Sequence, residues 1–521
     1  MSSSADSAPP ETLPASHRLT RGDIIAGISV ALVLIPQSLA YAELAGLPAY
    51  YGLYAAAVPP LAAAFFASSR YLQTGPVAMT ALLTFGALSA FAEPFTEEWI
   101  KLAALLALIV GLTRLLLGLI RGGVIAYFMS QPVLVGFTTA AAILIVSSQL
   151  PTALGVRADG DTILSRLWWT ITHFDEWEMT AIILSLITVA LVAGGRRIHR
   201  LFPGVLIAVG VGIVYSVVAG YEGLRVGDVD LSFPGSPLDL PWGDVWSLIV
   251  PGAVIALVGF AEPAAIARIF AAQDRERWSP NRELISQGVA NLASGLSGGF
   301  PVGGSFSRSS INRLVGGDTR WSGAVTGAAV LAFLPLAGVM SDLPRAVLAA
   351  IVVAAVARLI NIPRLLGFWR MSPVQALVAW ITFAATLILS PRIDLAVVLG
   401  VGLGITVHLW RELRVPVGSA YENGVLTLRP QGVVFFGSSP DVAEAMLELL
   451  AKYPDADRVV FDLAAVGRVD LTGALALKTL VDDARLAGLE ADVAGIPDHA
   501  ERVLKAVWEG ESATRRDRDS S

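Results

Sequence analysis

Long apolar runs occupy most of residues 24–411, and they constrain the fold more than any other feature of the sequence. A helix that spans a bilayer takes about 20 apolar residues, and about fourteen stretches of this kind follow one another. Only 15% of the residues are charged, against roughly 25% in an average soluble domain. The sequence therefore predicts a polytopic α-helical membrane protein.

The expected spans fall into two sets of equal size. The first set lies near residues 24–43, 50–66, 76–92, 100–120, 124–149, 179–193 and 203–219. The second set lies near residues 247–272, 284–299, 304–313, 321–340, 345–360, 373–390 and 393–410. Arginines flank both outer ends of this array, as is typical of cytoplasmic flanks, at positions 18, 21, 411 and 414. We expect a multi-pass protein of the inner (plasma) membrane with both termini in the cytoplasm.

Residues 412–521 alternate short apolar stretches with charged ones, as a soluble α/β domain does. Asn423-Gly424 predicts a hairpin turn. After it we expect strands near 433–436, 458–466 and 491–496 and helices near 441–452, 472–487 and 498–508. The predicted organisation is a disordered tail, a membrane domain, a small α/β domain and a second disordered tail, at residues 1–17, 18–414, 415–510 and 511–521.

Composition excludes several classes of function. The net charge is −6 and no basic stripe is present, so we expect no nucleic-acid partner. The chain has no cysteine, which excludes thiolate metal sites, Fe–S clusters and cysteine nucleophiles. The 5 histidines are scattered and lack the spacing of metal ligands. We therefore expect no metal, no cofactor and no enzymatic activity.

Two stretches rich in Gly, Pro and hydroxyl residues interrupt the apolar pattern, at residues 69–78 and 298–310. Each follows a helix in which a polar residue stands beside a proline, Gln37 in the first case and Glu262 in the second. Interrupted segments at corresponding places in two halves of a transporter indicate a binding site of discontinuous helices near the membrane midplane. Two ordinary loops between spans are the alternative interpretation.

Arg308 stands in the second interruption, beside the hydroxyls of Ser305, Ser307 and Ser309. A guanidinium is always charged and presents a fork of donors that suits oxyanions. Helices that begin after the two interruptions would each add about half a positive charge at their N-termini. Together these sum to about two positive charges, which suits a small anion rather than a cation. The alternative is a loop arginine in water.

Two acids are candidates for coupling anion movement to proton movement. Glu262 lies in an otherwise apolar run, where an ionisable residue indicates function by default; the alternative is a structural acid paired with Arg268 or with the backbone. Glu43 is the lesser candidate, near the end of its helix. In the C-terminal part, Thr472 is most simply a helix N-cap, and alternatively a phosphoacceptor or a neighbour of a bound anion.

Several motifs point to one family. The early ones are Pro36-Gln37-Ser38-Leu39-Ala40-Tyr41-Ala42, Ala45-Gly46-Leu47-Pro48, Tyr51-Gly52-Leu53-Tyr54, Ser69-Arg70 and Thr74-Gly75-Pro76-Val77-Ala78. The late ones are Asn281-Arg282-Glu283-Leu284, Gly288-Val289-Ala290-Asn291, Ser305-Phe306-Ser307-Arg308-Ser309 and Gly316-Gly317-Asp318-Thr319. With these motifs the sequence resembles, over nearly the whole chain, the SulP family of sulfate permeases and their solute-carrier relatives, which include pendrin and prestin. The C-terminal part resembles the STAS domain of such transporters and of bacterial anti-sigma-factor antagonists, and Thr472 falls at the loop that is phosphorylated in the antagonists.

The resemblance implies fourteen membrane segments in two inverted repeats of seven, divided into a mobile core and a gate domain, with a small cytoplasmic STAS domain. It implies that the substrate lies between half-helices three and ten, in a site lined by Gln37, Tyr41, Gly75, Pro76, Val77, Ala78, Ser305, Phe306, Ser307, Arg308 and Ser309. Glu262 falls where the family often has an acid tied to proton or sodium coupling. Family members are commonly homodimers.

The sequence departs from the family pattern at two positions, because Glu43 stands where an apolar residue is usual and Ala49 replaces the second of two prolines. Downstream of Glu262, Ala265 and Ile266 offer no hydroxyl for a sodium ion, which favours protons as the coupling ion.

We expect a secondary active transporter of small anions of the sulfate, bicarbonate or dicarboxylate class, working by proton symport and an elevator-like alternating-access mechanism. A nucleobase transporter of the same architecture is one alternative, although Arg308 and the STAS-like domain argue against it. An uncoupled anion channel or exchanger is the other.

Overall fold

The computed structural model describes residues 18–127, 130–160, 162–199, 201–228, 237–435 and 437–519. The chain divides into two compact units, one up to Gly402 and one from Leu403 onward. The first unit contains nearly all of the expected membrane domain, and the second contains the α/β domain. The tail expected at 1–17 lies outside the described residues.

The first unit is helical apart from two very short strands among its described residues. Its first half contains α1 (Arg21–Leu44), α2 (Tyr51–Phe66), β1 (Thr74–Gly75), α3 (Ala78–Leu88), α4 (Glu97–Leu119), η1 (Gly122–Tyr127), α5 (Gln131–Ala153), α6 (Ile163–Thr172), η2 (Phe174–Glu176), α7 (Met179–Val189), η3 (Ala190–Gly194), α8 (Gly195–Ile198) and α9 (Gly204–Ala219). Its second half contains η4 (Pro237–Asp239), η5 (Trp242–Asp244), α10 (Val245–Asp274), α11 (Pro280–Leu296), β2 (Gly303–Gly304), α12 (Phe306–Val315), α13 (Trp321–Phe333), η6 (Leu334–Met340), α14 (Arg345–Val356), η7 (Ala357–Leu359), α15 (Ile362–Met371), α16 (Pro373–Ile388) and the first part of α17 (Ile393–Glu412), which continues into the second unit. Each expected span overlaps one of these helices, so the polytopic helical architecture is confirmed.

Length and composition agree with a membrane environment. Within the described ranges, 7 helical segments are long and apolar enough to cross a bilayer, and shorter apolar helices accompany them. The expected span near 124–149 is divided between the end of η1 and most of α5. Ser130 occupies the N-cap position of α5 and Pro132 lies in its first turn, where proline favours the start of a helix.

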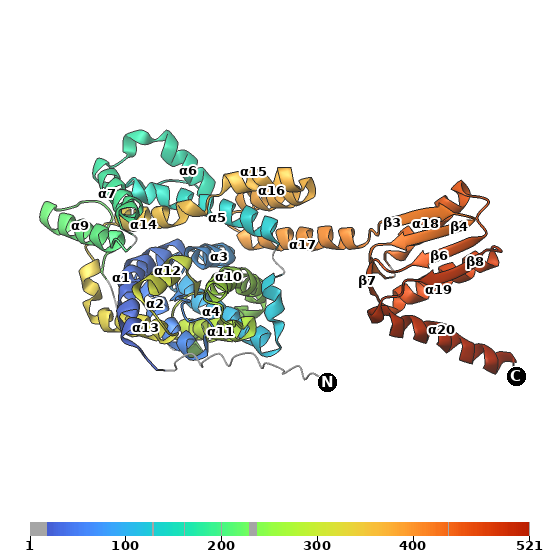
Figure 1. The fold of residues 1–521 in the computed structure, drawn as a ribbon. Helices are drawn as coiled ribbons and strands as arrows, with labels where there is room; N and C mark the ends of the chain where they lie inside the picture. The colour runs from blue at the N-terminus through green and yellow to red at the C-terminus, as the bar shows by residue number, and fades with distance from the viewer. Residues whose placement is uncertain are drawn as a thin grey trace. The chain divides into compact units, whose positions relative to one another are not determined.

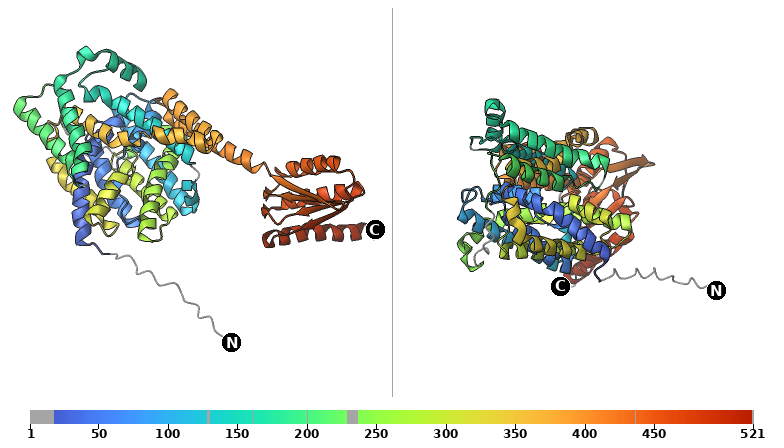
Figure 2. Two further views of the ribbon diagram at one scale, coloured as in Figure 1. Left: turned by 45° about the horizontal axis from the view of Figure 1, so that its top comes forward. Right: turned by 90° about the vertical axis from the view of Figure 1, so that its left-hand side faces the viewer.

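The helices of the first unit pack as two bundles (Figures 1 and 2). One bundle, which we call the core bundle, consists of α1, α2, α4, α10, α11, α12 and α13. The other, which we call the gate bundle, consists of α5, α7, α14 and α16, with α6, α9 and α15 on its side. The bundles meet where α1 contacts α14 and α9. Each bundle therefore combines helices from both halves of the sequence.

The N-terminus of α1 is anchored to the segment before α13. The Thr20 hydroxyl accepts a hydrogen bond from the Asp23 backbone N–H (3.1 Å) and begins the helix with a capping box. The buried Asp23 carboxylate also accepts from the backbone N–H groups of Asp318 (3.0 Å) and Thr319 (2.8 Å) and from the Thr319 hydroxyl (2.7 Å). The Asp318-Thr319 motif therefore holds α1 against the end of α12.

The second unit is a small α/β domain. Its sheet has the order β3–β4–β6–β8, in which β3 (Val417–Glu422) and β4 (Val425–Pro430) are antiparallel and β6 (Arg458–Asp462) and β8 (Glu490–Ala494) are parallel to β4. A separate pair joins β5 (Gly432–Val434) to β7 (Val466–Val469). The helices are α18 (Ser439–Lys452), α19 (Leu471–Leu486) and α20 (Asp498–Asp519).

The expected hairpin is confirmed, because Asn423 (φ 50°) and Gly424 (φ 81°) take the left-handed conformations of its tight turn. Two expectations need correction. The single strand expected at 458–466 is two strands, β6 and β7, in different sheets. The helix α20 extends to Asp519, through the segment expected as a C-terminal tail. Of the strand expected at 433–436, residue 436 lies outside the described residues.

Candidate functional site

The two interrupted stretches meet in space. The strands β1 and β2 pair antiparallel, with Thr74 opposite Gly304 and Gly75 opposite Gly303. The short helices α3 and α12 begin directly after these strands, at Ala78 and Phe306. Each interruption is therefore an extended segment followed by a half-helix, and the N-termini of both half-helices lie beside the paired strands.

Hydrogen bonds between the two interruptions hold this junction together. The Ser309 hydroxyl accepts from the Gln73 backbone N–H (2.9 Å), and the Ser305 backbone N–H donates to the Gln73 carbonyl (3.1 Å). The Gln287 side chain donates to the Thr74 hydroxyl (2.8 Å). Ser309, which the resemblance places in the anion site, thus contributes its oxygen to the contact between the interruptions.

The approach to β2 is fixed by two buried side chains that the sequence analysis did not single out. The Asn291 amide accepts from the Val302 backbone N–H (2.9 Å) and donates to the Val302 carbonyl (3.1 Å). Arg114 on α4 donates to the same carbonyl (2.9 Å) and to the carbonyls of Ala256 (3.0 Å) and Ile255 (3.2 Å) on α10. Arg114 could have been identified from the sequence, because it is an arginine inside an otherwise apolar span.

Arg308 supplies the positive charge of the junction. It projects from the first turn of α12, its side chain is fully buried, and within the described ranges its three guanidinium nitrogens have no hydrogen-bond partner. A Cβ atom built on Gly75 would lie 3.5 Å from Nη2 of Arg308, and Gly75 has φ +150°, a conformation that L side chains rarely adopt. Glycine at this position therefore brings the backbone of β1 next to the guanidinium.

Helix α1 contributes Gln37 and Tyr41 to the predicted site. Gln37 and Tyr41 are both buried, and their spacing of four places them on one face of the helix. Tyr41 interacts electrostatically with Arg308. On the first interruption, Pro76 and Val77 lead into α3, and Val77 takes its N-cap position without a capping side chain. The donors at the start of α3 are thus left for another partner.

The two candidate coupling acids lie in different surroundings. Glu262 on α10 accepts a hydrogen bond from the Phe306 backbone N–H and interacts electrostatically with Arg308 and Arg358. Glu43, near the end of α1, has its Oε1 atom 3.0 Å from Nε of Arg345 on α14. The structure therefore brings Glu262 to the N-terminus of α12 and pairs Glu43 with the gate bundle.

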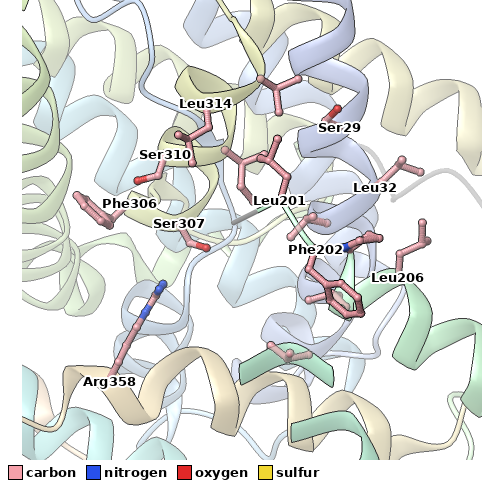
Figure 3. A pocket seen from close by; sticks show the side chains of 17 residues that line it. Ser29, Leu32, Leu201, Phe202, Leu206, Phe306, Ser307, Ser310, Leu314 and Arg358 are labelled. Atoms are coloured by element: carbon pink, nitrogen blue, oxygen red, sulfur yellow. The ribbon is translucent and has the colours of Figure 1, made fainter. Parts of the chain in front are cut away.

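A cavity of about 510 Å³ lies along the face of α12 that carries Ser307, Ser310 and Leu314 (Figure 3). Its walls come from α1, α12, the start of α9 and Arg358. Of the predicted site residues, Phe306 and Ser307 line this cavity. Ser305 instead takes the N-cap position of α12, where its hydroxyl accepts from the Arg308 backbone N–H.

In the second unit, the N-cap of α19 is Asp470, which corrects the prediction that Thr472 is the cap. The Asp470 carboxylate accepts from the Gly473 backbone N–H (2.7 Å) and from the Thr472 hydroxyl (2.7 Å). Partial burial alone would raise the pKa of Asp470, but these hydrogen bonds outweigh it and hold the pKa below its usual value. The Thr472 hydroxyl is thus bound to a carboxylate at the helix start.

Comparison with known proteins agrees with this geometry. Residues 20–382 match the Sulfate permease family, and residues 420–508 match the STAS domain. Probable sulfate transporter 4.2 of Arabidopsis thaliana is 30% identical over 512 residues, which cover 91% of this chain and 76% of the relative. A probable sulfate transporter of Mycobacterium tuberculosis is 36% identical over 377 residues, which cover 71% of this chain and 67% of the relative.

Solved structures show the same fold. The structure of SLC26A9 has a TM-score of 0.84 at 20% identity and covers 94% of this chain and 87% of its own. The transmembrane domain of the cyanobacterial bicarbonate transporter BicA has a TM-score of 0.63 at 23% identity, and it covers 74% of this chain and 97% of its own.

Proposed function

Because the chain belongs to the sulfate permease family, we propose that it is a secondary active transporter of small oxyanions of the sulfate, bicarbonate or dicarboxylate class. The observation that carries this proposal is Arg308, a buried guanidinium with no hydrogen-bond partner among the described residues. Buried guanidinium donors that lack hydrogen-bond acceptors are unfavourable. A site that keeps such donors beside two helix N-termini is suited to an anionic ligand that completes their hydrogen bonds.

The charges at the junction suit a monovalent or divalent anion. Arg308 contributes one positive charge, and the N-termini of α3 and α12 contribute about half a charge each. The Glu262 carboxylate, when ionised, occupies a backbone donor of α12 and removes about one charge from this sum. The positive charge that remains, about one, is too small to neutralise a divalent anion. Protonation of Glu262 returns the sum to about two. We therefore propose proton symport, with Glu262 as the coupling residue and Glu43 as the lesser candidate.

The two-bundle architecture supports an elevator-like mechanism. The proposed site residues Arg308 and Gly75 belong to the core bundle and its half-helices, while Arg345 and Arg358 belong to the gate bundle. Movement of the core bundle past the gate bundle would carry the site between the two sides of the membrane. We also propose a homodimer in the plasma membrane with both termini in the cytoplasm, and Thr472 as a regulatory phosphorylation site.

The alternatives differ in what they require at Arg308. A nucleobase presents neutral hydrogen-bonding edges, so a transporter of nucleobases has no use for a buried guanidinium whose donors lack hydrogen-bond partners. An uncoupled channel or exchanger accepts the same anions, and it is distinguished by flux that does not saturate or by transport that a proton gradient does not drive.

The test is uptake into proteoliposomes of radiolabelled sulfate, bicarbonate, chloride, succinate and uracil, each with and without an inward proton gradient. We expect saturable uptake of at least one oxyanion and none of uracil. Arg308→Ala should abolish or greatly weaken this uptake while the protein still folds, whereas Arg370→Ala, which removes an exposed arginine of α15, should not. Wild-type rate and affinity in Arg308→Ala would show that the site is assigned wrongly.

Coupling is tested separately. Glu262→Gln mimics the protonated carboxyl, so this variant should still exchange anion in counterflow but lose the response to an imposed proton gradient. Glu43→Gln serves as the matched control and should keep that response. If Glu262→Gln concentrates anion in a proton gradient as well as wild type does, the coupling residue is Glu43 or transport is uncoupled.

A further inference from the structure

The cavity beside α12 brings an arginine of the gate bundle, Arg358, together with Phe306 and Ser307 of the predicted site. Most of its lining is apolar, from residues such as Leu32, Phe202 and Leu206, and its polar side chains include Ser29, Ser307, Ser310 and Arg358. Figure 3 shows the Arg358 guanidinium directed toward the α12 turn that carries Ser307. An apolar pocket with a few convergent polar groups is the usual form of a small-ligand site.

Arg358 comes from the gate bundle. It lies in η7, directly after α14, and its side chain is exposed to the cavity. No described acidic residue lies within ion-pair distance of it, and its electrostatic interaction with Glu262 reaches across to the core bundle. Its charge is thus available to a ligand in the cavity.

We propose that Arg358 and Ser307 form a second anion station, on the cavity side of α12, which receives a small oxyanion before it reaches Arg308. This inference rests on the proposed transport function and adds a residue that none of the sequence motifs contains. The guanidinium fork and a serine hydroxyl both donate hydrogen bonds to oxyanion oxygens. Arg358 is exposed, so water screens part of its attraction for the anion.

The first turn of α12 connects the two stations. Ser307 faces the cavity, and the next residue, Arg308, is fully buried on another side of the same turn. Successive residues of an α-helix point about 100° apart, so an anion that leaves Ser307 has to pass about 100° around the helix to reach Arg308.

The station is made of one residue from each bundle. Ser307 moves with the core bundle and Arg358 with the gate bundle. The pair is therefore complete only while the bundles lie as in this structure, and any displacement of one bundle past the other separates its two halves. Arg358 should accordingly affect loading from the side to which this cavity opens more than loading from the opposite side.

The absence of cysteine from the chain permits a charge-replacement experiment. Arg358→Cys is reconstituted in proteoliposomes and treated with a cationic or an anionic methanethiosulfonate reagent, and uptake of radiolabelled sulfate and bicarbonate is measured. Removal of the charge should raise KM about twofold to fivefold, the scale of an exposed, solvent-screened charge. The cationic reagent should lower KM again, and the anionic reagent should raise it further. Added sulfate should slow the labelling, and high ionic strength should reduce every difference.

Arg370→Cys is the matched control, because it removes an exposed arginine from α15, away from the cavity lining. Its KM should not depend on the charge of the reagent. If wild type and Arg370→Cys transport anion and Arg358→Cys has the same KM before and after either reagent, the second station does not exist. If wild type transports none of the anions tested, the proposed function fails instead.

Discussion

Replacement of Arg114 should show whether the buried guanidinium fork holds the anion junction in place. Its three nitrogens donate to the carbonyls of Ala256, Ile255 and Val302, and no carboxylate is among these partners. Arg114 therefore joins α4, α10 and the segment before β2 through one fully buried side chain. Any change that breaks these hydrogen bonds should loosen the segment that leads into α12.

The magnitude depends on which residue replaces the arginine. Methionine loses three charge-assisted hydrogen bonds of about 1.5–3 kcal/mol each, but it also removes a buried charge whose desolvation costs several kcal/mol. The carbonyls keep other donors, since Val302 retains the Asn291 amide and the α10 carbonyls retain the helix ladder. We therefore expect Arg114→Met to cost only about 1–3 kcal/mol.

Lysine should be worse than methionine. A lysine keeps the buried charge, but its compact ammonium does not span the three carbonyls that the planar fork reaches. A buried charge that has lost its partners costs about 3–5 kcal/mol. Arg114→Lys should therefore be less stable than Arg114→Met, although it is the chemically closer substitution.

The assay is thermal unfolding in detergent, followed by fluorescence size-exclusion chromatography, together with KM for the transported anion. Leu116→Met, on the exposed face of the same helix, is the control for a new methionine and should melt like wild type. We expect melting temperatures in the order wild type, Arg114→Met, Arg114→Lys, and a raised KM in both variants. A lysine variant as stable as wild type would refute the role of the fork.

Three further predictions follow from other parts of the structure. Deletion of residues 415–521 should leave the membrane domain inserted and able to bind anion in a binding assay, because no proposed site residue lies there; normal insertion without binding would show that this part helps to build the site. Asp470→Ala should destabilise the isolated domain in urea by about 1 kcal/mol at neutral pH. The folded-state pKa of Asp470 is lowered, so the loss of unfolding free energy should be fully present above the unfolded pKa and should shrink as pH falls through the folded pKa. A loss that does not depend on pH would contradict the role of Asp470 as the cap. Gly52→Val should abolish the monodisperse folded protein in size-exclusion chromatography, because a Cβ at Gly52 would collide with the Ser38 carbonyl, and normal folding would contradict that close approach of α1 and α2.

The junction of the two interruptions could be predicted from the sequence because its signals are local. Glycine and proline clustered at 75, 76, 303 and 304 disfavour a continuous apolar helix, and their corresponding places in two halves indicate a shared site. The hairpin at Asn423-Gly424 is predictable for a similar reason, since few residues adopt its left-handed turn. In each case the backbone chemistry of single residues determines the local structure.

Side-chain contacts across the fold could not be predicted in this way. Asn291 is bonded to both backbone groups of Val302, yet an asparagine in a polar stretch of helix carries no pattern that names its partner. The Ser309 hydroxyl accepts a hydrogen bond from the Gln73 backbone N–H, a contact that the serine's place in its motif does not predict. Such contacts depend on the packing of α11 and α12 against the interruptions, which sequence spacing does not determine.

The two candidate coupling acids show most clearly what the fold adds. Both Glu43 and Glu262 stand in apolar helices, so the apolar pattern alone makes both candidates. Glu43 lies against Arg345, and moving a proton there would leave a partly buried arginine uncompensated. The Glu262 carboxylate interacts with the Phe306 N–H and with Arg308. We propose that the anion binds these same groups. Only an acid that competes with the anion for those groups links its own protonation to anion binding, so the geometry favours Glu262 for coupling.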